Sequence, residues 1–389
     1  MTRPVFRILL TLLFCSSLAA HEVDVKLLST MKVQVVSVSA SRGNYMLLLD
    51  GKRQHDTLAA KVFQLLIIND SLEVRIQGDT LGRFGSFVLK PLADTCIFKI
   101  KPIKPLSGTR TYDGQLSITI RDNYLHCRNE VELESYVCGV VESESGGQGG
   151  SEFYKVQAIL CRTYALAQLG RHITEGYDVC DGVHCQVYRS RTSHPEITAA
   201  AQTTAGLVLV DKGLTLITAA FHSNCGGQTA NSEDVWGGTL PYLRGRSDSF
   251  CNGMPHARWE RRIAKDDWLN GLAQRYKYPI EDSVACRMAC NMKQNSRTNY
   301  FSYGGVRIAY KNLRTDWQLK SAYFTVTEAG DSVIIRGRGY GHGVGMCQEG
   351  AINMARKGFE YRYILTYYYK GVDIVHISRL AFFKEEEQE

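Results

Sequence analysis

An apolar helical stripe in the first half of the chain ends in a glutamate. The stripe has the i, i+3, i+4 spacing of one helix face and consists of Leu133, Tyr136, Val137, Val140 and Val141. Glu144 is the next position of the same series, and a glycine-rich segment follows it. Partial burial there would disfavour the charged carboxylate and raise the pKa of Glu144, as a general acid working near neutral pH requires. The alternative is that Glu144 is a solvated residue at the end of a helix.

Cysteines and histidines gather in a second stretch. Cys180, His184 and Cys185 lie within six positions of one another, and His172 lies eight positions before Cys180. Thiolates and imidazoles are zinc ligands, so a compact turn could place these side chains around one ion. Four protein ligands would leave no position open for water, which favours a structural zinc. A Cys180–Cys185 disulfide is the alternative interpretation.

Two further stretches have the composition of a saccharide cleft. Residues 221–248 combine many polar side chains with Trp236, which offers hydrogen bonds for hydroxyls and an apolar face for a ring. A surface loop without function is the alternative, but unstructured connections of this length are uncommon. Near the C-terminus, alternating glycines at 337–345 allow close backbone approach and lack the spacing of a phosphate loop. His342 and Gln348 are the obvious polar ligands of that stretch.

A pair of helices must position Glu144. The stripe predicts the first helix, and Ser151 is the predicted N-cap of a second helix that is apolar on nearly all sides and therefore buried. Upstream, residues 23–103 contain runs of strand-forming residues, and a hairpin turn at Asp122–Asn123 leads directly into the helix pair. The predicted fold class is α+β, with mixed sheets around a central buried helix pair and a β-rich N-terminal region.

Composition and the N-terminal residues indicate an exported globular protein. Of the 389 residues, 44% are apolar and 22% charged, as in ordinary globular proteins. Residues 1–20 place a basic segment, a short apolar run and small residues in the order of a signal peptide, so no transmembrane helix is expected in the mature chain. The expected location is the periplasm, the cell envelope or the exterior, with Cys15 as a candidate lipid anchor.

The net charge and the cysteine content indicate which partners and which compartment suit the protein. The net charge of +7 is mild and suits a polyanionic surface such as a bacterial wall. The chain lacks a Lys/Arg block interleaved with aromatic residues, which argues against nucleic acid as a partner. Twelve cysteines fit an oxidising compartment.

Four ordered stretches resemble the stage II sporulation protein D (SpoIID) family, which includes the amidase enhancer LytB. They are LESYVCGVVESE with QAILCRTYALA, then YDVCDGVHCQVY, then FHSNCGGQTANSEDVWGGTLPYLRGRSD, then RGRGYGHGVGMCQEGAINMARKGFEYRYILTYYYKG. The likeness spans about residues 112–371. The chain departs from its relatives at Ser145 and the following glycines, where Met-Pro is frequent. It also departs at Cys225 and Cys347, where small polar residues are common.

The residue patterns and the resemblance together predict a division of the chain. Residues 1–20 are the expected signal peptide and 21–108 a β-rich accessory region. Residues 109–375 are the expected SpoIID/LytB-like catalytic domain, with a less typical insertion at about 255–320. An acidic tail is expected at 376–389.

The resemblance also implies a peptidoglycan lytic transglycosylase that cleaves MurNAc–GlcNAc bonds in peptide-stripped glycan strands. Glu144 would be its single catalytic acid and base. A structural zinc would be held by Cys180, His184 and Cys185, with His172 as the fourth ligand. The substrate-binding candidates are Arg162, Tyr164, His222, Ser223, Asn224, Trp236, His342 and Gln348. Membership does not imply sporulation, since the family also occurs in non-sporulating bacteria.

Three alternatives stay open. An ordinary glycosidase needs a second carboxylate; Glu142 lies about 200° around the helix from Glu144 and Glu134 about three turns away, so Glu233 or Asp234 would have to supply it. A non-catalytic wall-binding protein could instead enhance a partner N-acetylmuramoyl-L-alanine amidase. A zinc hydrolase would use the His/Cys cluster directly in catalysis.

Overall fold

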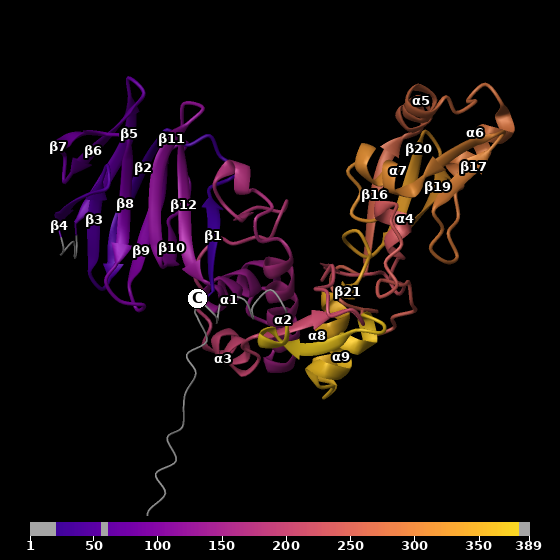
Figure 1. Cartoon of the computed structure of the whole chain (residues 1–389). Helices are drawn as coiled ribbons and strands as arrows, with labels where there is room; N and C mark the ends of the chain where they lie inside the picture. Colours follow the sequence, from indigo (N-terminus) through magenta and orange to yellow (C-terminus); the bar gives the residue numbers. More distant parts are fainter. Residues whose placement is uncertain (1–20, 56–60, 381–389) are drawn as a thin grey trace, which may run out of the picture.

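The computed structural model describes residues 21–55 and 61–380 and confirms an α+β fold with a β-rich N-terminal region (Figure 1). The predicted signal peptide, with Cys15, and residues 381–389 of the predicted tail lie outside the described residues. In the described ranges, no helix combines the length and apolar character needed to cross a bilayer.

Two sheets of the N-terminal part pack face to face, and Phe63 and Phe87 meet between them with ring centroids 5.4 Å apart. The first sheet has the order β13-β1-β12-β11-β8-β3-β4, with bounds Val179–Cys180, Glu22–Leu27, Tyr124–Glu132, Gln115–Arg121, Ser86–Pro91, Tyr45–Leu49 and Lys52–His55. The second has the order β10-β9-β2-β5-β6-β7, with bounds Arg110–Asp113, Ile97–Lys104, Val35–Arg42, Val62–Ile68, Ser71–Ile76 and Asp79–Phe84. Strands on both sides of residue 108 belong to the same two sheets, so the expected domain boundary there falls inside one β unit.

The predicted helix pair follows the hairpin directly. α1 spans Leu133–Ser145 and α2 spans Ser151–Ala167. Helices α3 (Pro195–Thr203), α8 (Gln348–Arg356) and α9 (Tyr361–Tyr368) pack against α2, which is buried along most of its length. The Glu132 carboxylate caps α1 by accepting hydrogen bonds from the backbone N–H groups of Glu134 and Ser135. Ser151 is not the N-cap of α2: Gly150 occupies that position, and Ser151 is the first helical residue.

A separate lobe, residues 258–338, has its own hydrophobic core around Trp268. Figure 1 shows the lobe and the β unit on opposite sides of the helices. Its two end strands pair with each other, with Arg258 opposite Arg338. The lobe extends beyond the expected insertion at 255–320. Its elements are β16 (Arg258–Ala264), α5 (Lys265–Tyr276), α6 (Ser283–Cys290), β17 (Tyr300–Tyr303), β18 (Val306–Ala309), α7 (Tyr310–Asp316), β19 (Phe324–Ala329) and β20 (Ser332–Arg338).

The remaining strands and helices of the described chain are short. β15 (Phe221–His222) pairs in parallel with β21 (Met346–Cys347), which leads into α8. The other elements are η1 (Ile173–Glu175), β14 (Leu207–Val210), α4 (Ser232–Trp236), β22 (Asp373–His376) and η2 (Ile377–Arg379). β22 pairs with β14, so residues 376–380, which were assigned to the tail, belong to the folded domain.

Candidate active site

Glu144 lies in the last turn of α1 and is half-buried, as the apolar stripe predicted. Its Oε1 accepts a hydrogen bond from the backbone N–H of Val187 at 2.7 Å. Burial raises the pKa of the Glu144 carboxyl, while the Val187 hydrogen bond and the charge of Arg189 partly offset that rise. The side chain can therefore hold a proton at a higher pH than a solvated glutamate can.

Two clefts meet at this carboxyl. One, of about 570 Å³, extends from Glu144 past Tyr164 to Trp236 and His342. The other, of about 500 Å³, extends from Glu144 toward Ser223 and Gln348. Both volumes are in the range of small-ligand sites. Because Glu144 lines both clefts, a polymer that occupied the two would pass over its carboxyl.

The first cleft has an aromatic platform with a polar edge. Trp236 is 47% exposed although it is a large apolar side chain. Its ring centroid lies 5.3 Å from that of His342. His342 Nδ1 accepts a hydrogen bond from the Val344 backbone N–H at 3.1 Å, which leaves the ring proton on Nε2. Burial lowers the pKa of His342 to about 4, so the ring is neutral near pH 7.

The second cleft contains a histidine–carboxyl pair that sequence reasoning missed. His256 Nδ1 lies 2.6 Å from Oε1 of the buried Glu349, and Ser223 Oγ lies 3.2 Å from the same ring nitrogen. Gln348 Nε2 donates to the backbone carbonyl of Glu144 at 3.3 Å, so this amide supports the end of α1. His256 lies in the stretch without family likeness, and nothing in its local pattern marks it as part of a site.

Three predicted substrate-binding residues do not line the clefts. Arg162 is fully buried, with its guanidinium bonded to the Glu134 carboxylate at 2.5 Å. Asn224 is buried and donates to Glu349 Oε2 at 2.6 Å. His222 is buried against His342, and its Nδ1 donates to the Val344 carbonyl at 3.1 Å. These side chains position their neighbours and do not face a ligand.

The carboxylates considered as partners of Glu144 are engaged elsewhere. Glu142 accepts hydrogen bonds from Thr192 and Ser193. Glu233 forms an ion pair with Arg244 at 2.8 Å. Asp234 accepts a hydrogen bond from Asn231 at 2.9 Å. In the described residues, Glu349 is the second carboxylate that shares a cleft with Glu144.

The predicted metal ligands lie close together beside the first cleft. Ligand atoms of His172, His184 and Cys185 all lie within 4.8 Å of one another. Cys185 Sγ is 3.6 Å from His172 Nε2 and 3.5 Å from His184 Nδ1, and Cys180 Sγ is 4.0 Å from His184 Nδ1. Both cysteines carry free thiols. Tetrahedral zinc with bonds of about 2.0–2.3 Å needs ligand atoms roughly 3.3–3.8 Å apart, so His172, His184 and Cys185 fit the ion. Cys180 lies outside this group of three and would have to move closer to complete the set.

A carboxylate behind His172 supports that fit. Glu175 Oε1 lies 2.7 Å from His172 Nδ1, which directs Nε2 toward Cys185. The same segment continues through Gln186 to Val187, whose N–H holds Glu144. The segment that carries the candidate metal ligands therefore also holds the candidate acid in place.

The fold and the site define a class: an α+β protein with one half-buried carboxyl between two clefts and a His/Cys centre beside it. The sequence model described as stage II sporulation protein (SpoIID) matches residues 121–210. An uncharacterized protein of Brachyspira hyodysenteriae is 31% identical over 289 residues, covering 73% of this chain and 77% of that protein. Stage II sporulation protein D of Bacillus subtilis is 28% identical over 260 residues, covering 63% of this chain and 74% of that protein.

A further relative is the amidase enhancer of Bacillus subtilis, 28% identical over 286 residues, which cover 61% of this chain and 40% of the enhancer. The chain belongs to the SpoIID/LytB family, as its four ordered stretches predicted.

Proposed function

We propose that this protein acts in the bacterial cell wall as a lytic transglycosylase, which cleaves the MurNAc–GlcNAc bonds of peptidoglycan glycan strands. The observation that carries the proposal is the half-buried carboxyl of Glu144 at the junction of two clefts. Membership of a family with stage II sporulation protein D and the amidase enhancer supports a role in the cell wall.

The proposed reaction needs one carboxyl group. Protonated Glu144 donates its proton to the glycosidic oxygen, which leaves with GlcNAc while positive charge builds on the MurNAc anomeric carbon. The carboxylate then accepts the proton of the muramic 6-hydroxyl, whose oxygen bonds to that carbon and closes a 1,6-anhydro ring. Because Val187 N–H occupies Oε1, the other carboxyl oxygen is the one available for these transfers.

The two clefts would hold the sugar units on either side of the bond. Trp236 offers an apolar face to one ring, and His342 and Tyr164 add polar groups at its edge. Ser223 and the His256–Glu349 pair would hydrogen-bond hydroxyl or amide groups on the opposite side.

We also propose that His172, Cys180, His184 and Cys185 bind a zinc ion with a structural role. Four protein ligands would leave no coordination position for a reacting water, which argues against a zinc hydrolase. The bound ion would fix the turn that carries Val187, and thereby the orientation of Glu144.

The proposal includes a location and an order of events. Residues 1–20 would direct export to the cell envelope, with Cys15 as an optional lipid attachment site. A requirement for peptide-stripped strands would place an N-acetylmuramoyl-L-alanine amidase before this protein. The similarity to the amidase enhancer keeps a second candidate function, a non-catalytic partner that binds glycan and stimulates such an amidase.

The test is mass spectrometry of the products from intact and amidase-treated peptidoglycan. A transglycosylase releases fragments with anhydro ends, one water lighter than hydrolysis products. Glu144→Gln should abolish them, whereas Glu142→Gln, on the same helix but bonded to Thr192, should not. Unchanged release by Glu144→Gln would remove Glu144 from the mechanism. Reducing ends that disappear in Glu349→Gln would indicate two-carboxylate hydrolysis. Glycan binding without new ends would favour the enhancer function.

A further inference from the structure

A second group of metal-ligating side chains lies away from the His/Cys centre. Cys225, Asp248, Cys251 and Cys347 are all buried, and their ligand atoms lie within 4.8 Å of one another. The four residues come from three segments that are distant in sequence. These are the turn after β15, the loop that precedes the lobe, and the start of α8.

The distances fit a tetrahedral ion better than a disulfide. Cys225 Sγ lies 3.3 Å from both Cys251 Sγ and Asp248 Oδ2. A disulfide needs sulfur atoms about 2.05 Å apart. Zinc bonded to thiolates at about 2.3 Å separates its ligand atoms by roughly 3.8 Å. A small adjustment of the side chains would therefore place all four atoms around one ion.

Backbone N–H groups point at one of the sulfur atoms, as they do around metal-bound thiolates. Cys347 Sγ accepts from the N–H of Cys225 at 3.2 Å and of Gly350 at 3.4 Å. Each of these contacts stabilises negative charge on sulfur.

The carboxylate is held in the same way. Asp248 Oδ2 accepts from the hydroxyl of Tyr368 at 2.9 Å, and Oδ1 accepts from the Phe250 N–H at 2.9 Å. These bonds aim Oδ2 at Cys225 and support its use as a ligand. Among the described residues no basic side chain bonds to any of the four ligand atoms, so a bound cation would be the positive charge next to the buried carboxyl.

Metal binding would release the thiol protons of the cluster, since zinc takes cysteine as the thiolate.

We propose that Cys225, Asp248, Cys251 and Cys347 form a second metal site, for zinc or another thiophilic divalent ion. The set fills all four positions of a tetrahedron and is closed to solvent, so the ion is structural. The site is separate from the His172/His184/Cys185 group, and the proposal does not depend on the reaction assigned to Glu144.

The metal ion would stabilise one wall of the second cleft. Ser223, Gln348 and Glu349 line that cleft, and each lies within two residues of a proposed ligand. A single ion would thus tie β15, the loop before the lobe and α8 together at the point where they face the candidate substrate. Loss of the ion would loosen this wall while leaving the turn that holds Glu144 intact.

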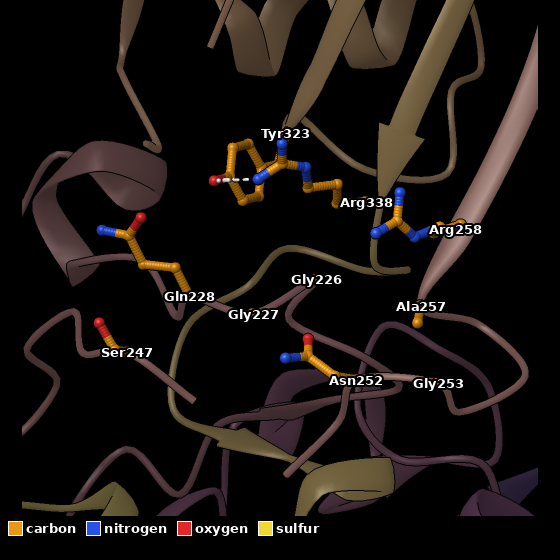
Figure 2. A pocket seen from close by; sticks show the side chains of 10 residues that line it. All are labelled: Gly226, Gly227, Gln228, Ser247, Asn252, Gly253, Ala257, Arg258, Tyr323 and Arg338. Atoms are coloured by element: carbon orange, nitrogen blue, oxygen red, sulfur yellow. Dashed lines mark hydrogen bonds between the residues drawn. The ribbon is translucent and has the colours of Figure 1, made fainter. Parts of the chain in front are cut away.

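A third cavity, of about 430 Å³, lies on the other side of the same turns (Figure 2). Gly226, Gly227 and Asn252, which adjoin Cys225 and Cys251, form one wall, and Arg258 and Arg338 of the lobe lie across from them. Glu144 does not line this cavity. It brings solvent close to the glycine turn, and none of the four proposed ligands lines it.

The first experiment is elemental analysis of the purified full chain. The wild type is expected to hold two metal ions, one for each ligand group. Cys225→Ser and Asp248→Asn should each lose one ion, as should Cys185→Ser. The matched control Cys286→Ser, a free cysteine in the lobe, should keep both. Glu144→Gln should also keep both, which separates this site from the proposed function.

Two further measurements test the proposal even if the cluster variants fail to fold. X-ray absorption at the zinc edge of Cys185→Ser should show three sulfur ligands and one light atom around the remaining ion. Peptide mapping of the wild type without reductant should show Cys225, Cys251 and Cys347 as thiols. A Cys225–Cys251 crosslinked peptide, or a wild type with one ion that is lost in Cys185→Ser, would overturn the proposal.

Discussion

Replacing Arg162 by Met separates two interpretations of a central arginine. Sequence reasoning placed Arg162 among the substrate ligands, whereas the structure buries it completely. Its guanidinium forms two bonds to Glu134, at 2.7 and 2.5 Å, and donates to the Leu207 carbonyl at 2.9 Å. Removing one partner of a buried ion pair costs about 3–5 kcal/mol. Because Glu134 keeps some solvent access, with 24% of its side chain exposed, we expect the low end, about 3 kcal/mol.

The assay is urea unfolding followed by tryptophan fluorescence, together with steady-state kinetics on glycan strands. Arg162→Met should lower the unfolding midpoint strongly, and Arg162→Met with Glu134→Leu should recover part of the loss, because no carboxylate is then left unpaired. Arg171→Met is the matched control, since Arg171 is exposed and lines the first cleft. It should raise KM with little change in stability. Unchanged stability with a large rise in KM for Arg162→Met would refute the structural role.

Three further predictions test the site. Trp236→Ala should raise KM for glycan about tenfold, equal to roughly 1.4 kcal/mol of lost ring contact, with kcat and unfolding nearly unchanged; an unaltered KM would remove Trp236 from the cleft's function. Gly350→Ala should lower stability by about 1–3 kcal/mol and metal content with it, because the new Cβ would lie 2.3 Å from the Tyr368 hydroxyl and 2.7 Å from Asp248 Oδ2; Gly108→Ala, where a Cβ meets open space and φ is not positive, is the control and should keep both stability and metal. Burial raises the pKa of Glu144 in the folded state, so the contribution of this carboxyl to stability should be fully present below its ordinary pKa of 4.5 and should be lost as pH rises through the raised value; in Glu144→Gln that part of the pH dependence should vanish, and activity of the wild type should decline as the same carboxyl ionises.

Local sequence patterns predicted the helix pair and the half-buried position of Glu144. The stripe that ends at Glu144 has helical periodicity over a few turns, and the structure has that helix with Glu144 half-buried. The candidate metal-binding turn is also local in sequence, which is why Cys180, His184 and Cys185 could be grouped before the fold was known. The group that the structure brings within 4.8 Å is His172, His184 and Cys185.

Side-chain direction and long-range pairing could not be inferred in the same way. Residues 222–224 alternate along an extended segment, so Ser223 faces a cleft while His222 and Asn224 are buried. A family likeness marks the whole segment and does not tell the two faces apart. The His256–Glu349 pair joins residues 93 positions apart, and no local pattern predicts such a contact.

The lobe at 258–338 begins and ends at two residues that lie next to each other. Arg258 and Arg338 are partners on neighbouring strands, so their Cα atoms lie about 5 Å apart. A short turn could bridge that gap, and the polypeptide would run on from the loop before β16 to the glycines after β20. The lobe could therefore be shortened, enlarged or replaced without a change in the path of the remaining chain. Its contacts with that chain would change, because Arg297 of the lobe donates to the backbone carbonyls of Gln228 and Cys225. Evolution can therefore change the surface beside the two clefts while Glu144 and the turn that supports it stay unchanged.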